Sequence, residues 1–274
     1  FKKYKKFNSI IHCAAQPSHD WAKNDPVIDF DVNARATLLL LNLTNKYTKK
    51  SSFVYLSTNK VYGDKVNSFK FKELRSRYEL ISSNTYSKKG ISENMNVDQS
   101  KHSLFGASKL SADILVQEYG RYNNLNTVCF RCGCLTGPMH SGAELHGFLS
   151  YLLKSYVENK TYNVFGYKGK QVRDNLHSKD LINIIWEYIK KPKKNAVYNI
   201  GGGRYSNCSV LEAIKLCEKI GNKKFKYKIK KKSRIGDHIW WISDLSKFKK
   251  DYPGWKQRYD IKMIINEMYE YLTK

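Results

Sequence analysis

The sequence predicts an α/β fold, in which a doubly wound parallel sheet is joined to a smaller, mixed α/β region. The first half alternates apolar, strand-like runs with amphipathic, helix-like segments, and this order favours parallel strands with right-handed crossovers. The chain of 274 residues is also long enough to bury a sizeable core. We expect the sheet in residues 1–135 and the second region in 136–274, with strand 197–200 as a candidate to return to the first sheet.

Strand-like runs in the first half end in small or hydroxyl-bearing residues, which leave room for a ligand at the strand tips. Asp25 followed by Pro26 marks the start of a long helix, because proline is favoured in a first helical turn. Residues 64–103 form a polar stretch without clear periodicity. The predicted elements are, in order, a strand at 8–15, a helix at 25–49, a strand at 53–57, a helix at 104–122 and a strand at 126–131.

The second half mixes helices and strands less regularly and contains a lysine-rich segment at 223–232. That segment alternates lysine with apolar residues, a period of two that is typical of a strand with one face in water. We expect Ser178 or a neighbour to cap the helix that begins there. The other predicted elements are a helix at 148–158, a strand at 162–165, a turn at 166–169, a strand at 197–200, a turn at 201–203, and helices at 209–220 and 261–271.

The formal net charge of +25 raises the question of a nucleic-acid function. The lysines, however, are spread along the whole chain, which indicates a compositional bias rather than a binding surface. We therefore predict no nucleic-acid partner, although the same positive field would favour an anionic small substrate. No apolar run approaches the roughly 20 residues of a membrane span, so we expect no membrane partner either.

The six cysteines do not form the dense pattern of a disulfide framework. Cys129, Cys132 and Cys134 cluster, but a structural zinc site generally needs four ligands, and this cluster lies on a strand-like run. We interpret these residues as buried thiols and predict no metal site. The cysteine pattern then indicates a reducing, cytoplasmic compartment.

The most informative feature is a pair of segments, 57–63 (STNKVYG) and 105–109 (FGASK). The first follows an apolar strand, so its hydroxyl groups lie where open parallel sheets bind ligands. The second opens an amphipathic helix on which Phe105 and Lys109 share a face. A hydroxyl at a strand tip and a lysine one turn into a helix suit the nicotinamide-dependent oxidation of an alcohol.

Further segments stand in a consistent order along the chain, namely 12–15 (HCAA), Asn33, 106–109, 173–180 (RDNLHSKD) and 199–202 (NIGG). Together with 57–63 they resemble the extended short-chain dehydrogenase/reductase superfamily, the sugar-nucleotide epimerases and dehydratases. Within it, residues 57–64 and 169–174 (GKQVRD) are most similar to the CDP-paratose 2-epimerases, also called CDP-tyvelose 2-epimerases. The resemblance implies a Rossmann-type fold, NAD as the cofactor and a nucleotide sugar as the substrate.

By position, the resemblance assigns roles around the cofactor and the substrate. Ser57 would approach the nicotinamide, while Thr58 and Asn59 would contact the sugar. Lys109 would bind the nicotinamide ribose and supply positive charge from the helix surface, so that its loss would affect activity and not folding. Arg173 would pair with the substrate's pyrophosphate. The remaining cofactor residues would be Ala14, Ala15 and Gln16, with Asn33 bracing the adjacent strand. The resemblance also implies a homo-oligomer.

Two features depart from the superfamily's pattern. Phe105 stands where those enzymes carry a tyrosine whose phenolate accepts the proton of the oxidised hydroxyl, and a phenyl ring cannot do this. We name His102 as the candidate base and Tyr62 as a second candidate. The chain also lacks, before His12, the glycine-rich turn that holds the dinucleotide's pyrophosphate. We therefore expect an N-terminally truncated Rossmann domain that binds NAD poorly.

The predicted function is an NAD-dependent nucleotide-sugar epimerase that acts at C2 of a CDP-linked dideoxyhexose through transient oxidation to a ketone. A 4-epimerase or a 4,6-dehydratase of the same superfamily is one alternative, although dehydratases use an Asp-Glu pair where this chain has Asn59 and Lys60. A catalytically degenerate nucleotide-sugar-binding protein is another, and Phe105 favours it. For three residues the alternative is a purely structural role. That role is an ion pair with Asp174 or Asp180 for Arg173, a place in the core for His12, and packing or helix capping for His177.

Overall fold

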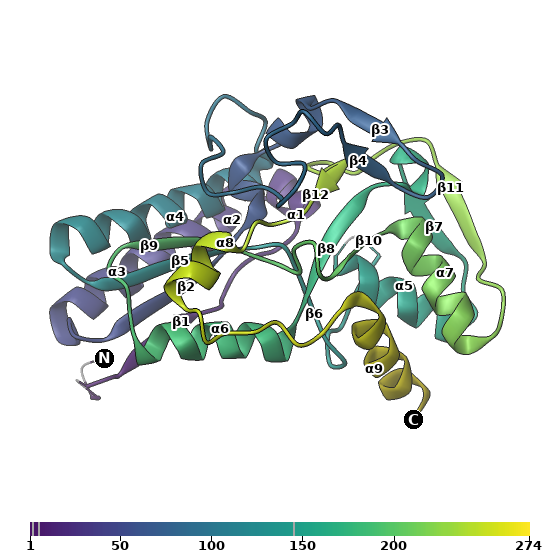
Figure 1. Cartoon of the computed structure of the whole chain (residues 1–274). Helices are drawn as coiled ribbons and strands as arrows, with labels where there is room; N and C mark the ends of the chain where they lie inside the picture. The colour runs from purple at the N-terminus through teal and green to yellow at the C-terminus, as the bar shows by residue number, and fades with distance from the viewer. Residues whose placement is uncertain (2, 5, 145) are drawn as a thin grey trace.

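The computed structural model describes residues 1, 3–4, 6–144 and 146–274. Its main sheet has four parallel strands in the order β1-β2-β5-β9, which confirms the predicted parallel sheet (Figure 1). Strand β9 comes from the second half of the chain and pairs with β5. The strands are β1 (Ser9–His12), β2 (Ser52–Thr58), β5 (Asn126–Cys132) and β9 (Ala196–Ile200).

Helices cover both faces of this sheet, because alternate residues of its central strands point to opposite sides. Phe53 and Tyr55 of β2 pack with helices α3 and α4, whereas Val54 between them packs with α6 and α8 on the other side (Figure 1). The four helices are α3 (Ala36–Tyr47), α4 (Ser103–Asn123), α6 (Ser178–Lys190) and α8 (Ser246–Asp251). Burial on both faces explains why these strands read as continuous apolar runs.

The long helix predicted from Asp25 is present as three consecutive segments. The side chain of Asp25 accepts a hydrogen bond from the backbone N–H of Ile28, and Pro26 occupies the first turn, as the sequence indicated. The segments are α2 (Pro26–Phe30), a π-helical turn η1 (Asp31–Arg35) and α3. A short helix that the sequence analysis did not anticipate, α1 (His19–Asn24), precedes them.

The second region has its own core, built from helices that pack beside a two-stranded parallel sheet (Figure 1). The helices predicted at 148–158, 209–220 and 261–271 are confirmed, and Ser209 forms a capping box with Glu212. The elements are α5 (Phe148–Val157), α7 (Val210–Gly221), α9 (Ile261–Thr273), β7 (Tyr162–Phe165) and β11 (Tyr227–Lys230).

The lysine-rich segment does contain a strand, β11, but the prediction that one of its faces is buried is wrong. All four of its residues are exposed, because β11 pairs through its backbone with β7 at the surface. The buried aromatic ring of this segment belongs to Phe225, two residues before the strand. Lysine alternation therefore reflects an exposed strand rather than a half-buried one.

A third sheet joins the two regions around β8 (Val172–His177), which is buried along its whole length. The unpatterned stretch 64–103 packs against this sheet through a cluster that includes Ile91, Trp240 and Trp241. The remaining elements are β6 (Cys134–Thr136), β10 (Asn207–Ser209), β12 (Trp240–Trp241), the hairpin β3 (Phe71–Glu73) and β4 (Tyr78–Leu80), and the 3-10 turns η2 (Asn59–Tyr62), η3 (Lys65–Ser68) and η4 (Tyr167–Gly169).

Two further findings concern membrane-spanning helices and the cysteines. Within the described residues, no helix has the length and apolar character needed to cross a membrane. Cys129 and Cys132 are buried as predicted, whereas Cys134 is half-buried and Cys13 is exposed. Among the described side chains, no group of three or more histidine, cysteine or acidic residues is arranged to hold a metal ion.

Candidate active site

A cleft of about 450 Å³ opens where β2 and β5 end, between the main sheet and the second region. The ends of parallel strands are where an open α/β sheet binds its ligands, so the location agrees with the sequence analysis. The cleft is lined by both predicted catalytic segments and by residues more than 100 positions later in the chain. Its polar and charged lining residues include Thr58, Asn59, Lys60, Lys109, His19, Arg173, Arg234 and Asp237.

Thr58 is the last residue of β2 and lines the cleft. Its side-chain oxygen accepts a hydrogen bond from the backbone N–H of Lys60, 3.2 Å away, and thereby caps the 3-10 turn η2. Thr58 therefore stabilises the end of the strand, as a threonine at such a position often does. It also lies in the cleft lining. Asn59 lines the cleft beside it and is buried.

Lys109 lies in the cleft lining together with Phe105, one helical turn before it on α4. The expectation of a solvent-facing lysine is wrong, since Lys109 is only 3% exposed. Its Nζ donates to the carbonyl oxygen of Leu56 at 2.9 Å and lies 4.3 Å from the ring centroid of Tyr55. Burial lowers the pKa of Lys109 to about 8. The ammonium is thus held against β2, close to the strand end that carries Thr58.

A buried polar cluster beneath the cleft holds β2, β5 and α4 together. Asp113 of α4 is fully buried and accepts two hydrogen bonds from Arg131, at 3.1 and 2.8 Å. Ser57 donates to the same carboxylate at 2.6 Å, so its hydroxyl is engaged by Asp113, although the residue still lines the cleft. The sequence analysis missed Asp113, because a single aspartate on an amphipathic helix gives no sign of burial.

The segment after β1 contributes alternate residues to the cleft. Ala15 lines it, as do Cys13 and Pro17, but Ala14 and Gln16 do not. An extended chain points successive side chains to opposite sides, so the three predicted cofactor residues cannot all face one cavity. Gln16 points instead toward the long helix, where it is buried.

Asn33 ties this segment to helix α4. Its side-chain oxygen accepts from the backbone N–H of Gln16 at 2.9 Å, and its amide nitrogen donates to the carbonyl of Gln16 at 3.1 Å. The same nitrogen lies 3.0 Å from the hydroxyl of Ser108, next to Lys109 on α4. The π-helical turn η1 places Asn33 in this buried position. The geometry agrees with the bracing role that the resemblance implied.

The structure does not bring either candidate base, His102 or Tyr62, into the cleft lining. Both ring nitrogens of His102 lie within hydrogen-bonding distance of backbone carbonyls, those of Ser100 at 2.8 Å and Val61 at 2.9 Å. Tyr62 donates to Asn199 at 2.8 Å and accepts from Arg131 at 3.0 Å, and burial raises its pKa to about 12. Both residues therefore hold the loop around η2 in place.

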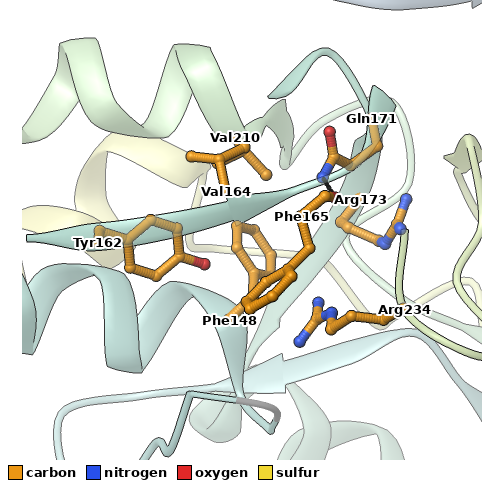
Figure 2. A pocket seen from close by; sticks show the side chains of 8 residues that line it. All are labelled: Phe148, Tyr162, Val164, Phe165, Gln171, Arg173, Val210 and Arg234. Atoms are coloured by element: carbon orange, nitrogen blue, oxygen red, sulfur yellow. Dashed lines mark hydrogen bonds between the residues drawn. The ribbon is translucent and has the colours of Figure 1, made fainter. Parts of the chain in front are cut away.

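The second region supplies two guanidinium groups to the cleft, those of Arg173 and Arg234. Arg173 forms a buried ion pair with Asp237, not with Asp174 or Asp180 as the structural alternative had it. Arg234 has no ion-pair partner among the described residues. Figure 2 shows the two arginine side chains at one end of a small adjoining pocket, whose walls include the rings of Phe148 and Tyr162. Sequence reasoning missed Arg234, although this arginine, with Gly236 and Asp237, stands directly after the lysine-rich segment.

Lys60 connects these two halves of the cleft. Its Nζ donates to the carbonyl of Gly236 at 2.8 Å and lies 3.4 Å from Nδ1 of His238, whose Nε2 lies 2.8 Å from the carbonyl of Gly63. Burial, followed by repulsion from Arg173, lowers the pKa of Lys60 to about 8. The loop 234–238 is thereby fastened to the segment that carries Thr58.

Two other predicted residues have structural roles. His12 is buried, with Nε2 2.9 Å from the hydroxyl of Thr37, as expected of a core histidine. His177 caps α6 by accepting from the backbone N–H of Lys179, and its ring stacks on Tyr259 with 4.0 Å between centroids. Both histidines lie outside the cleft lining.

Comparison with known proteins agrees with this geometry. Residues 1–201 match the model described as the NAD dependent epimerase/dehydratase family. The chain belongs to this family. Among its curated relatives is CDP-paratose 2-epimerase of Salmonella typhi, 30% identical, with 97% of this chain and 78% of the relative covered. A dTDP-glucose 4,6-dehydratase of Escherichia coli is 27% identical, with 90% and 68% covered.

Solved structures of sugar-nucleotide epimerases have the same fold as this chain. The UDP-glucose 4-epimerase of Thermus thermophilus, in complex with NAD, superposes with a TM-score of 0.81 at 19% identity, over 100% of this chain and 79% of that one. A mutant of UDP-glucuronic acid 4-epimerase from Bacillus cereus gives a TM-score of 0.79 at 24% identity, over 99% and 77%. The Rossmann-type arrangement of the main sheet is thereby confirmed.

Proposed function

We propose that this family member is an NAD-dependent nucleotide-sugar epimerase that acts at C2 of a CDP-linked dideoxyhexose. The observation that carries the proposal is the convergence of Thr58, Lys109, Arg173 and Arg234 on the lining of one cleft. A hydroxyl and an ammonium group suit the oxidation of a sugar alcohol. Two guanidinium groups suit the pyrophosphate of a nucleotide sugar, since each can form paired hydrogen bonds to phosphate oxygens.

The residues near Lys109 fit the nicotinamide end of NAD. The lining residues Cys13 and Ala15 are small and exposed, so a flat ring can approach the backbone closely. Among the described groups, Lys109 Nζ has one carbonyl partner and one aromatic face, which leaves N–H donors for ribose hydroxyls. Bound there, NAD would take up the hydride from the sugar carbon and later return it.

The protein's own residues would position the reacting sugar. Thr58 would hydrogen-bond to the hydroxyl that is oxidised, and the nearby Lys109 charge would favour loss of its proton. Arg173 and Arg234 would hold the pyrophosphate, so that the sugar is anchored at its far end while the ketone turns over in the cleft. Anchoring of this kind lets hydride return to the opposite face of the sugar.

Two observations favour 2-epimerisation over the alternatives. The curated relative at 30% identity is a CDP-paratose 2-epimerase. Dehydration would need an acid and a base after Thr58, whereas Asn59 and Lys60 occupy those positions in the cleft. Lys60 is moreover tied to Gly236 and His238.

We also propose, from the resemblance, that the protein is a cytoplasmic homo-oligomer.

The direct test is incubation of the protein and NAD with CDP-paratose or CDP-tyvelose, followed by NMR of the sugar. We expect interconversion of the two, visible as a change in the coupling between the protons at C1 and C2. UDP-glucose and dTDP-glucose serve as controls. Inversion at C4 of either control would favour the 4-epimerase alternative, a 4-keto-6-deoxy product would favour the dehydratase, and binding of CDP-sugars without turnover would favour the degenerate protein.

Replacement of Arg234 tests the phosphate end of the cleft. We expect Arg234→Met to raise KM for the CDP-sugar roughly 10- to 100-fold, with kcat changed less, because a charge-assisted bond to the pyrophosphate is lost. Steady-state kinetics measure both constants. Lys228→Met removes the same charge from the exposed strand β11 and should leave KM unchanged. An equal rise in KM in both variants would indicate a general effect of net charge.

A further inference from the structure

Phe105 leaves the proposed oxidation without the phenol that would accept the hydroxyl proton, so another group must take it. His19 is the first residue of helix α1 and follows the segment 13–17, alternate residues of which line the cleft. It lines the same cleft as Thr58 and Lys109. Its ring meets that of Phe105 edge-on, with 4.9 Å between ring centroids and 71° between ring planes. The imidazole of His19 therefore lies directly beside the phenyl ring of Phe105, which cannot accept the proton.

We propose that His19 is the proton acceptor of the reaction, in place of the absent tyrosine. This inference rests on the proposed function and deepens it. The hydroxyl proton of the sugar would pass to Nε2 of His19, while hydride from the same carbon passes to NAD⁺ and the carbon–oxygen double bond forms. In the return half, hydride adds to the other face of the carbonyl, and the imidazolium of His19 gives its proton back to the alkoxide.

The orientation of the ring suits this role. Nδ1 of His19 lies 2.8 Å from the hydroxyl of Ser103, two residues before Phe105 on α4. Donation from Nδ1–H to that oxygen leaves the lone pair of Nε2 free to accept a proton. The hydroxyl of Ser103 also accepts from the backbone N–H of Gly106 at 3.3 Å, which fixes its position.

The backbone on either side of the chain fixes the position of His19. Ser103, its hydrogen-bond partner, has φ of 60°, a left-handed conformation that a non-glycine residue adopts only where the surrounding structure imposes it. A Cβ added to Gly236 would lie 2.5 Å from Cε1, 2.7 Å from Nδ1 and 3.3 Å from Nε2 of His19. The backbone of the loop 234–238 thus closes directly on the imidazole. A ring fixed in this way is preorganised for proton transfer.

Burial, together with nearby positive charges, keeps the imidazole of His19 neutral. Burial, and then repulsion from Lys60, lower its pKa to about 3; Arg234 and His146 act in the same direction, and Asp237 opposes them. A neutral ring is the form that accepts a proton. Binding of a pyrophosphate at Arg234 would offset the repulsion from that arginine and raise the basicity of His19 when substrate is present. His102 and Tyr62 lack a comparable position, since neither lines the cleft.

The test compares His19→Asn, Phe105→Tyr and the double variant with the wild-type protein and NAD. We expect His19→Asn to lose about 100-fold or more in turnover of the CDP-sugar, with CDP binding by calorimetry unchanged. Phe105→Tyr alone should change turnover little. The double variant should recover at least tenfold, because the phenol supplies the missing acceptor. His177→Asn is the matched control, as it removes an imidazole outside the cleft and asparagine can replace its helix-capping hydrogen bond.

Nitrogen NMR of the histidine rings supplies a measurement that does not depend on activity. At neutral pH the resonance absent from His19→Asn should report a neutral ring with its proton on Nδ1; a charged ring or a proton on Nε2 would contradict the proposal. Full turnover in His19→Asn, or a loss that the double variant does not recover, would also overturn it. A wild-type protein inactive on CDP-sugars would instead refute the proposed function, and this inference with it.

Discussion

Lys109→Met should lower turnover about 1,000-fold, a typical cost of removing one preorganised electrostatic group from an active site. The ammonium of Lys109 lies in the cleft at the end of β2, and burial strengthens its effect on a developing alkoxide. Methionine keeps a long apolar side chain and removes the charge, its hydrogen-bond donors and the contact of the ammonium with the Tyr55 ring. Single-turnover reduction of NAD, followed by the absorbance of the reduced nicotinamide, measures the step concerned.

Folding provides the control for this substitution. Lys109→Met loses the hydrogen bond to Leu56 but no longer buries a charge, so the free energy of unfolding should change by no more than about 2 kcal/mol. Lys109→Ala would also leave a cavity, which makes it a less suitable variant. Wild-type turnover in a folded Lys109→Met protein would show that the proposed mechanism does not apply to this chain.

Asp113→Ala should destabilise the fold by about 3–5 kcal/mol, because it leaves the guanidinium of Arg131 buried without its partner. The carboxylate accepts from both Arg131 and Ser57, so its loss also leaves the Ser57 hydroxyl at the end of β2 unpaired. Chemical denaturation followed by circular dichroism measures the free energy of unfolding. We expect a lower midpoint with an unchanged slope.

Two further variants separate the buried pair from a general effect of charge. Asp98→Ala removes an exposed carboxylate and should change the free energy of unfolding by less than about 0.5 kcal/mol. The double variant Asp113→Leu/Arg131→Met replaces both charges with apolar groups and should recover much of the lost stability. A single Asp113→Ala variant as stable as the wild type would mean that water reaches Arg131 and solvates its charge.

Sequence alone was sufficient for the elements with strong local determinants. The apolar runs of β2 and β5 predict strands buried on both faces, and Asp25 with Pro26 marks the start of the long helix before any contact is known. The placement of Thr58 at a strand tip and the shared face of Phe105 and Lys109 follow from the same periodicities. These features depend on neighbours within a few residues, and such neighbours are visible in the order of the chain.

Tertiary structure decided everything that depends on which side chains meet across long separations. Burial of Lys109, the engagement of His102 by two carbonyls and the pairing of Arg173 with Asp237 all arise from segments that lie far apart in the chain. His19 and Arg234 meet in the cleft lining because α1 and the loop 234–238, far apart in the chain, pack against each other there. Local patterns determine a residue's element and face, whereas its solvation and charge environment depend on distant chain segments that only the folded state brings together.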